Sequence, residues 1–213
     1  MAARDYGQYC GVTTALELVG ERWAMLIVRD LLVGPRRYGE LAAGLPRIPS
    51  NILAARLKEL QAAGILRRAP RSRIIIYELT PFGRELEPVV LALGAWGFKA
   101  LGDPRDEQVI TPDAMTITLR TAFRPQVASA LPTTTYGARF GAAELLVRVD
   151  GSTLDVTRGD GPADLAFAAG PDIRRLISGE LAPHRAIATG VVQVLRGPDN
   201  LLDRFASTFH LAA

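Results

Sequence analysis

The chain has 213 residues, 48% of them hydrophobic, which is enough to bury the core of one large domain or of two small ones. No apolar run approaches the roughly 20 residues needed to cross a bilayer, and no secretory signal pattern opens the chain, so we expect a cytoplasmic protein with no membrane partner. A single cysteine excludes an internal disulfide. Two scattered histidines argue against a metal centre, and we expect no cofactor.

Charge is distributed unevenly along the chain. Residues 1–101 carry 14 Lys and Arg against 9 Asp and Glu, whereas the remaining residues carry 11 against 13. A basic half joined to a slightly acidic half is expected when one part of a protein meets a polyanion and the other does not.

The first fifty residues show helical periodicity. Apolar residues three or four apart predict helices with one buried face over residues 12–19 and 23–31, and Gly34-Pro35 ends this stretch. A short helical segment is expected over residues 38–45. Another helix should begin at Ser50, as its N-cap, and end at Gly64. Its buried side would carry Leu53, Leu57 and Leu60.

A hairpin and a long helix are expected next. Strands over residues 65–68 and 74–79 flank a basic, proline-containing tip. Thr80-Pro81 then caps a helix that runs to about Leu101 and is kinked at Pro88. Its apolar side chains exceed what one small domain can bury, so we expect a homodimer. The predicted interface comprises Tyr6, Tyr9, Leu86, Val89, Val90, Leu93 and Trp96.

The polar segment 102–112 is predicted to link a domain of residues 1–101 to a second domain of residues 113–213. The second domain is expected to be α+β. Strands are predicted over Met115–Leu119, 144–149 and 153–156, the last two joined by a turn. Helices are predicted over residues 172–178 and 200–209.

The order of elements in the first half is typical of a winged helix-turn-helix, in which a capped helix enters the major groove and the hairpin follows the backbone. The helix side opposite its apolar stripe would face the bases with Asn51, Ala54, Ala55 and Lys58. Ser50, at the start of this helix, is also expected to be a DNA-binding residue. Phosphates would be met by Arg36, Arg37, Arg47, Arg68, Arg71 and Arg73. Alternatively, these charges form the solvated surface of an ordinary helical domain. Their convergence on the helix start and the hairpin tip favours DNA.

Several motifs of the first half resemble the HxlR family of MarR-like regulators. They are Cys10-Gly11-Val12, the segments 15–23 and 31–41, Leu57-Lys58-Glu59-Leu60, and the segment 77–83. The resemblance covers about residues 8–99 and implies a homodimer that binds double-stranded DNA at a pseudo-palindromic operator, with no enzyme activity. The family commonly has proline after the cysteine and phenylalanine in place of Tyr38. Neither difference touches the expected DNA surface.

The second half resembles the sterol carrier protein type two fold, through segments 146–151, 164–167, 173–181, 188–194 and 201–209. This resemblance implies an apolar cavity for a hydrophobic small-molecule effector. The candidate lining residues are Phe123, Phe140, Phe167, Leu176, Leu181 and Phe205. Alternatively, each of these side chains fills the core.

Three functions therefore stay open. The first is a regulator tuned by a hydrophobic ligand. The second is a carrier or modifying protein that uses the winged helix only to dimerise. The third is a redox-sensing regulator that acts through Cys10, which requires an exposed thiol of lowered pKa. The competing interpretation of Cys10 is a buried, inert thiol in the dimer interface.

Overall fold

The structure, a computed structural model, describes residues 5–105 and 107–212. It divides into two compact units, of which the first ends at Val90 and the second begins at Leu91. Both units combine helices and strands, so the α+β class is confirmed. None of the helices in the described parts of the chain is long and apolar enough to cross a membrane.

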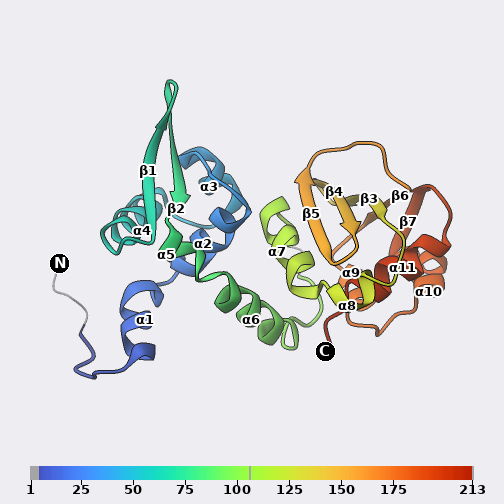
Figure 1. Cartoon of the computed structure of the whole chain (residues 1–213), viewed down its shortest axis with the longest axis horizontal. Helices are drawn as coiled ribbons and strands as arrows, with labels where there is room; N and C mark the ends of the chain where they lie inside the picture. Colours follow the sequence, from blue (N-terminus) through green and yellow to red (C-terminus); the bar gives the residue numbers. More distant parts are fainter. Residues whose placement is uncertain (1–4, 106, 213) are drawn as a thin grey trace. The chain divides into compact units, whose positions relative to one another are not determined.

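The first unit contains four helices, a hairpin and a further helical turn, in the predicted order (Figure 1). Two strands form the hairpin, which extends away from the helices of its unit. The predicted helices and both strands are confirmed to within a few residues. The elements are α1 (Gly11–Val19), α2 (Ala24–Val33), α3 (Tyr38–Gly44), α4 (Ser50–Ala62), β1 (Leu66–Arg71), β2 (Ile74–Leu79) and α5 (Pro81–Arg84).

The apolar face of α2 packs as its periodicity predicts, because Ile27 and Leu31 are fully buried. Helix α1 behaves differently. Val12 is 69% exposed and Leu16 is 50% exposed, while Val19 is buried. The prediction of one buried face is therefore wrong for most of α1 within a single chain. An exposed apolar stripe on a helix is typical of a surface that another protein surface covers.

The predicted continuous helix from Thr80 to Leu101 is instead two helices, α5 and α6 (Glu87–Phe98). The start is as expected: the Thr80 side chain accepts a hydrogen bond from the Gly83 amide at 3.1 Å. Pro88 lies in the first turn of α6, where its missing N–H costs no helical hydrogen bond. The chain therefore breaks before the proline and does not kink at it.

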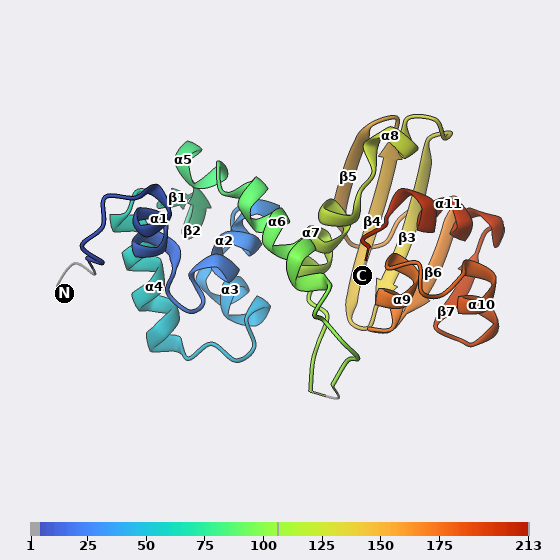
Figure 2. The same ribbon diagram turned by 90° about the horizontal axis from the view of Figure 1, so that it is seen from below.

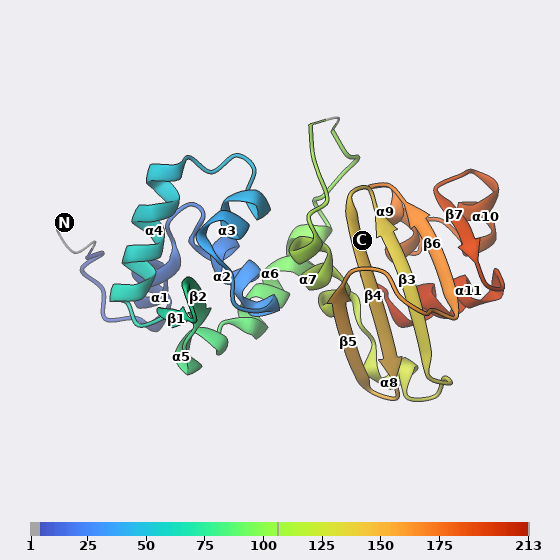
Figure 3. The same cartoon turned by 90° about the horizontal axis from the view of Figure 1, so that it is seen from above.

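The second unit is built on a five-stranded sheet of order β5-β4-β3-β6-β7, in which only the β3–β6 pair is parallel. Figures 2 and 3, taken from opposite sides, show α9, α10 and α11 on one face of this sheet. The strands and helices predicted from residue 144 onward are confirmed. The elements after α6 are α7 (Pro112–Ala122), α8 (Pro125–Ala128), β3 (Thr134–Phe140), β4 (Ala143–Asp150), β5 (Thr153–Arg158), β6 (Leu165–Ala169), α9 (Ile173–Ile177), α10 (Pro183–Ala188), β7 (Val192–Arg196) and α11 (Asn200–Thr208).

The strand predicted over Met115–Leu119 is wrong, because these residues lie within α7. Thr111 caps the helix by accepting a hydrogen bond from the Ala114 amide at 3.3 Å, and Pro112 occupies the first turn. The threonines that mimicked strand alternation turn their hydroxyls back to carbonyls one turn earlier. Thr118, for example, donates to the Ala114 carbonyl at 3.0 Å.

Candidate nucleic-acid interface

Helices α3 and α4 form a helix-turn-helix pair. Leu41 and Leu45 are buried at the end of α3, and Leu53 is buried at the start of α4. The Tyr38 hydroxyl donates a hydrogen bond to the carbonyl of Ser50 at 2.8 Å, which ties the first turns of the two helices together. Ser50 is not the N-cap that the sequence predicts. That position belongs to Pro49, and Ser50 is the first helical residue.

The outer side of α4 is polar or small, as expected from its period. Asn51, Ala54 and Lys58 are exposed and Ala55 is half-buried, whereas the leucines of the opposite side are buried. Arg56, which sequence reasoning passed over, has a structural role. Its guanidinium pairs with Glu21 at 2.7 Å and with Glu59 one turn along. These ion pairs hold α4 in place and leave its outer side open.

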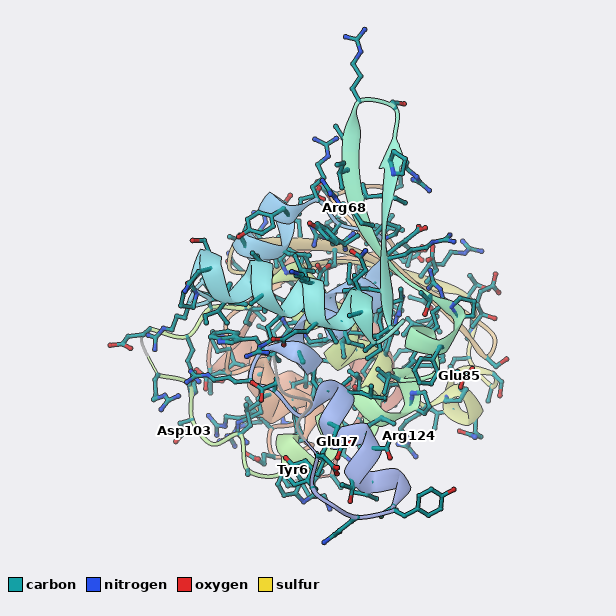
Figure 4. All side chains as sticks on the ribbon, turned by 90° about the vertical axis from the view of Figure 1, so that its left-hand side faces the viewer. Tyr6, Glu17, Arg68, Glu85, Asp103 and Arg124 are labelled. Atoms are coloured by element: carbon teal, nitrogen blue, oxygen red, sulfur yellow. The ribbon has the colours of Figure 1, made fainter. Side chains whose placement is uncertain are left out.

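The hairpin presents arginines on its exposed surface. Arg71 ends β1, and the two-residue turn consists of Ser72 and Arg73. Ser72 has a φ of 54°, the left-handed conformation that so tight a turn requires. Arg71 and Arg73 are exposed at the tip. Arg68, farther down β1, is also exposed (Figure 4). Arg67, one residue earlier, pairs with Glu78 across the strands at 2.7 Å.

The remaining predicted arginines lie in connections of the same unit. Arg36 exchanges backbone hydrogen bonds with Tyr77 at 3.0 and 2.7 Å, which forms an isolated β-bridge beside the hairpin. Its side chain is half-buried, and one Nη donates to the Pro35 carbonyl at 3.0 Å. Arg37, at the start of α3, and Arg47, in the helix-turn-helix turn, are exposed.

The side chains predicted to line a ligand cavity lie in the core of the second unit. Phe140, Phe167, Phe205 and Leu176 are at most 1% exposed. The Phe167 ring meets the rings of Phe140 and Phe205 edge to face, with centroids 5.9 and 5.1 Å apart. Leu181 joins this core, and Phe123 packs at its margin against Phe209. An apolar cavity does exist in the second unit, but other residues line it.

Cys10 immediately precedes α1 and is exposed, so the expected burial of this thiol does not occur within a single chain. Hydrogen bonds from the backbone amides of Thr13 and Val12 lower the pKa of the thiol, because they stabilise the thiolate at the helix N-terminus. Among the described residues, no three His, Cys, Asp or Glu side chains gather into a group that could hold a metal ion.

The helix pair α3–α4, followed by the basic β1–β2 hairpin, defines a winged helix-turn-helix DNA-binding unit. A family model described as HxlR-like helix-turn-helix matches residues 18–104. The HTH-type transcriptional regulator YdeP of Bacillus subtilis (strain 168) is 34% identical over 93 residues, which are 42% of this chain and 73% of YdeP. The chain therefore belongs to the HxlR family of helix-turn-helix transcription regulators.

Two further proteins are similar to part of this chain. The HTH-type transcriptional regulator Rv3095 of Mycobacterium tuberculosis (strain H37Rv) is 40% identical over 112 residues, 51% of this chain and 65% of Rv3095. The solved structure of reduced YodB, a transcriptional regulator from B. subtilis, is 34% identical. Its match covers 46% of this chain and 100% of YodB, with a TM-score of 0.39.

Proposed function

We propose that the protein is a homodimeric, sequence-specific transcription regulator of a pseudo-palindromic operator, and that an apolar small molecule in the second unit tunes its affinity for DNA. The observation that carries the proposal is the open side of α4 beside an arginine-tipped hairpin. Fluorescence anisotropy with DNA from upstream of its gene tests it. Loss of binding when either half-site is scrambled is the expected result, and equal binding to unrelated DNA would contradict it.

Exposed apolar stripes support the dimer. On α6, Val89, Leu93 and Trp96 are spaced as one helical stripe and are 47%, 49% and 74% exposed. On α1, Val12 and Leu16 are similarly open, and Tyr6 and Tyr9 lie exposed just before this helix. The Glu17 carboxylate accepts a hydrogen bond from the Tyr6 amide at 3.0 Å, which holds that segment against α1 (Figure 4).

Two residues of the predicted interface contribute differently. Val90 is only 7% exposed, so it packs within its own chain and we remove it from the proposed interface. Leu86 is half-buried. The inner side of α6 also contains Gly94, where an added Cβ would lie 3.1 Å from the Thr121 hydroxyl of α7. Because α6 uses this side within the chain, only the outer stripe is available to a second copy.

Base recognition is assigned to Asn51. We expect Asn51→Ala to lose discrimination at particular base pairs by about 1 to 3 kcal/mol, because a methyl group cannot replace a bidentate amide on adenine. Anisotropy titrations against single-base operator variants measure this loss. Gln61→Ala, an exposed amide near the other end of α4, is the matched control and should keep wild-type discrimination. Uniform weakening across all operator variants would indicate that Asn51 contacts the DNA backbone and not the bases.

Ligand regulation requires more than binding. A ligand shifts DNA affinity only if it binds one of two dimer arrangements more tightly than the other. We propose that the second unit supplies that ligand site and that its fold is of the sterol-carrier type. The mixed five-stranded sheet with helices on one face supports this assignment. A protein that bound apolar ligands but no DNA would instead be a carrier.

A second candidate function is redox sensing through Cys10, favoured by its exposure and lowered pKa. We expect the iodoacetamide alkylation rate of the native protein to rise with pH around a lower midpoint than in the same protein unfolded in guanidinium. The chain has one cysteine, so the whole signal belongs to Cys10. Equal midpoints would show that the pKa of the Cys10 thiol is not lowered in the native protein. Cys10→Ser protein that still lost DNA binding on oxidation would exclude the sensor.

A further inference from the structure

A cavity of about 220 Å³ lies within the second unit, where the end of α6 and the connection that follows it meet α7 and α9. Its inner wall is apolar and buried, and two exposed apolar side chains, Leu101 and Val109, lie at its rim. The volume is below the usual range for drug-sized ligands, so the cavity fits a small molecule. The buried part of the wall includes Phe98, Met115, Ile173 and Ile177.

The charged residue of this wall is already paired. Arg174 lines the cavity, and its two terminal nitrogens pair with Glu180 at 2.6 Å and Asp103 at 3.3 Å. Its Nε is shielded from solvent, so it offers no donor to the cavity. The Gln108 side chain accepts from the Arg105 amide, and the Thr118 hydroxyl donates to a carbonyl of its own helix.

We propose that this cavity binds a small, uncharged, apolar molecule, aromatic or branched. Its inner wall is apolar and buried, so a ligand that removes its own apolar surface from water there gains free energy. The ligand is uncharged because the two carboxylates beside Arg174 already offset its charge. The inference rests on the proposed effector site in the second unit and assigns its place and its ligand chemistry.

The cavity also bears on the proposed dimer. Phe98 of its wall lies in the last turn of α6, the helix whose outer stripe carries Val89, Leu93 and Trp96. A ligand that favours one packing of this turn would change the free energy of the dimer arrangement that uses the same helix. Sequence relatives that lack the second unit would lack this cavity, since α7 and α9 form its other walls.

Methionine NMR tests the cavity directly. The chain has three methionines, of which Met115 lines the cavity and Met25 lies on α2 of the other unit. In protein labelled with [methyl-13C]methionine, titration with acetophenone should shift the Met115 resonance and leave Met25 unmoved. The isosteric hydrocarbon α-methylstyrene should shift the same resonance and bind at least as tightly, because the wall is mainly apolar. A Met115 resonance that neither compound moves, or equal shifts at Met25, would overturn the proposal.

A matched pair of variants locates the site. Ala114→Phe should fill the cavity and abolish the Met115 shift, whereas Ala130→Phe, an exposed position outside the cavity, should not. A Met115 shift that persists in Ala114→Phe would overturn the proposal.

Operator anisotropy in acetophenone separates this inference from the proposed function. Binding at Met115 with unchanged DNA affinity would support the cavity and contradict ligand regulation. DNA affinity that changes while Met115 stays unmoved would support regulation and overturn the cavity.

Discussion

Replacing the two tip arginines together, as Arg71→Ala with Arg73→Ala, is expected to weaken binding to every DNA and to flatten its salt dependence. Each lost phosphate contact removes about 0.9 from the slope of log affinity against log salt, so the slope should fall by about two units. Between 50 and 200 mM salt the variant would then lose roughly tenfold less affinity than the wild type. Both side chains are exposed at the end of the hairpin, so their removal leaves its core packing intact.

The matched control is Arg185→Ala with Arg196→Ala, which removes the same charge from exposed positions of the second unit. It should leave the slope unchanged to within a few tenths. If the tip variant also kept the wild-type slope, the hairpin would not contact DNA. If both pairs of substitutions flattened the slope equally, the change in salt dependence would reflect the net charge of the protein and not the position of the hairpin.

The helix-turn-helix unit could be predicted from sequence because its boundaries are set by local signals. Gly34-Pro35 and Thr80-Pro81 each end or start an element through backbone constraints that need no tertiary context. The alternation of exposed and buried positions on α4 likewise follows from the helical period alone. The error at Ser50 is one residue in size, because helix ends depend on which neighbouring side chains reach the first amides.

Helix α7 shows where local pattern fails. Alternating Met, Thr and Ile satisfies a strand period over five residues, but Met115, Leu119 and Ala122 also satisfy a helical one and are buried. The capping threonine and proline at 111 and 112 were the signal that could have decided between them. The sequence analysis did not assign strands β3, β6 and β7. The β3–β6 and β6–β7 pairs join segments about thirty residues apart, which a local pattern does not indicate.

Sequence could predict one of the candidate sites and not the other. The arginines and Asn51 could be assigned because exposure on a known motif needs only the period and the element order. The cavity could not, because α6, α7 and α9 contribute to it from segments up to about eighty residues apart, from Phe98 to Ile177. The large aromatic residues predicted to line a cavity instead fill the core. Each aromatic ring removes a large apolar surface from water when it is buried against its neighbours.

The helical period of the sequence also predicted the apolar stripes of α1 and α6. It did not indicate which surface covers these stripes. In the structure these stripes remain open, and Trp96 is 74% exposed. An alternative to the interface is that Trp96 packs into the C-terminal half of its own chain, and this exposure argues against it. An open indole on a helix with two further apolar side chains in line is the composition of an interface hot spot, in which Trp is enriched.

Trp96→Ala is therefore expected to weaken the proposed dimer by about 2 to 4 kcal/mol, which corresponds to a roughly 30- to 700-fold rise in its dissociation constant. Sedimentation velocity at micromolar concentration should show monomer, while the circular dichroism spectrum of that monomer should match the wild type, since the indole makes few contacts within the chain. The midpoint of thermal unfolding should fall only by the stabilisation that dimerisation gave the wild type. Leu195→Ala on β7, another exposed apolar side chain, is the control and should leave the dimer intact.

Operator binding connects this result to function. A symmetric pair of α6 helices would place the two α4 helices, which are proposed to enter the major groove, on half-sites about 34 Å apart, one turn of DNA. The monomeric variant should thus bind a single half-site as the wild type does and lose the steep, cooperative binding to the full operator. A Trp96→Ala protein that stays dimeric and keeps wild-type operator affinity would rule out α6 as the interface and leave the stripe of α1 to supply it.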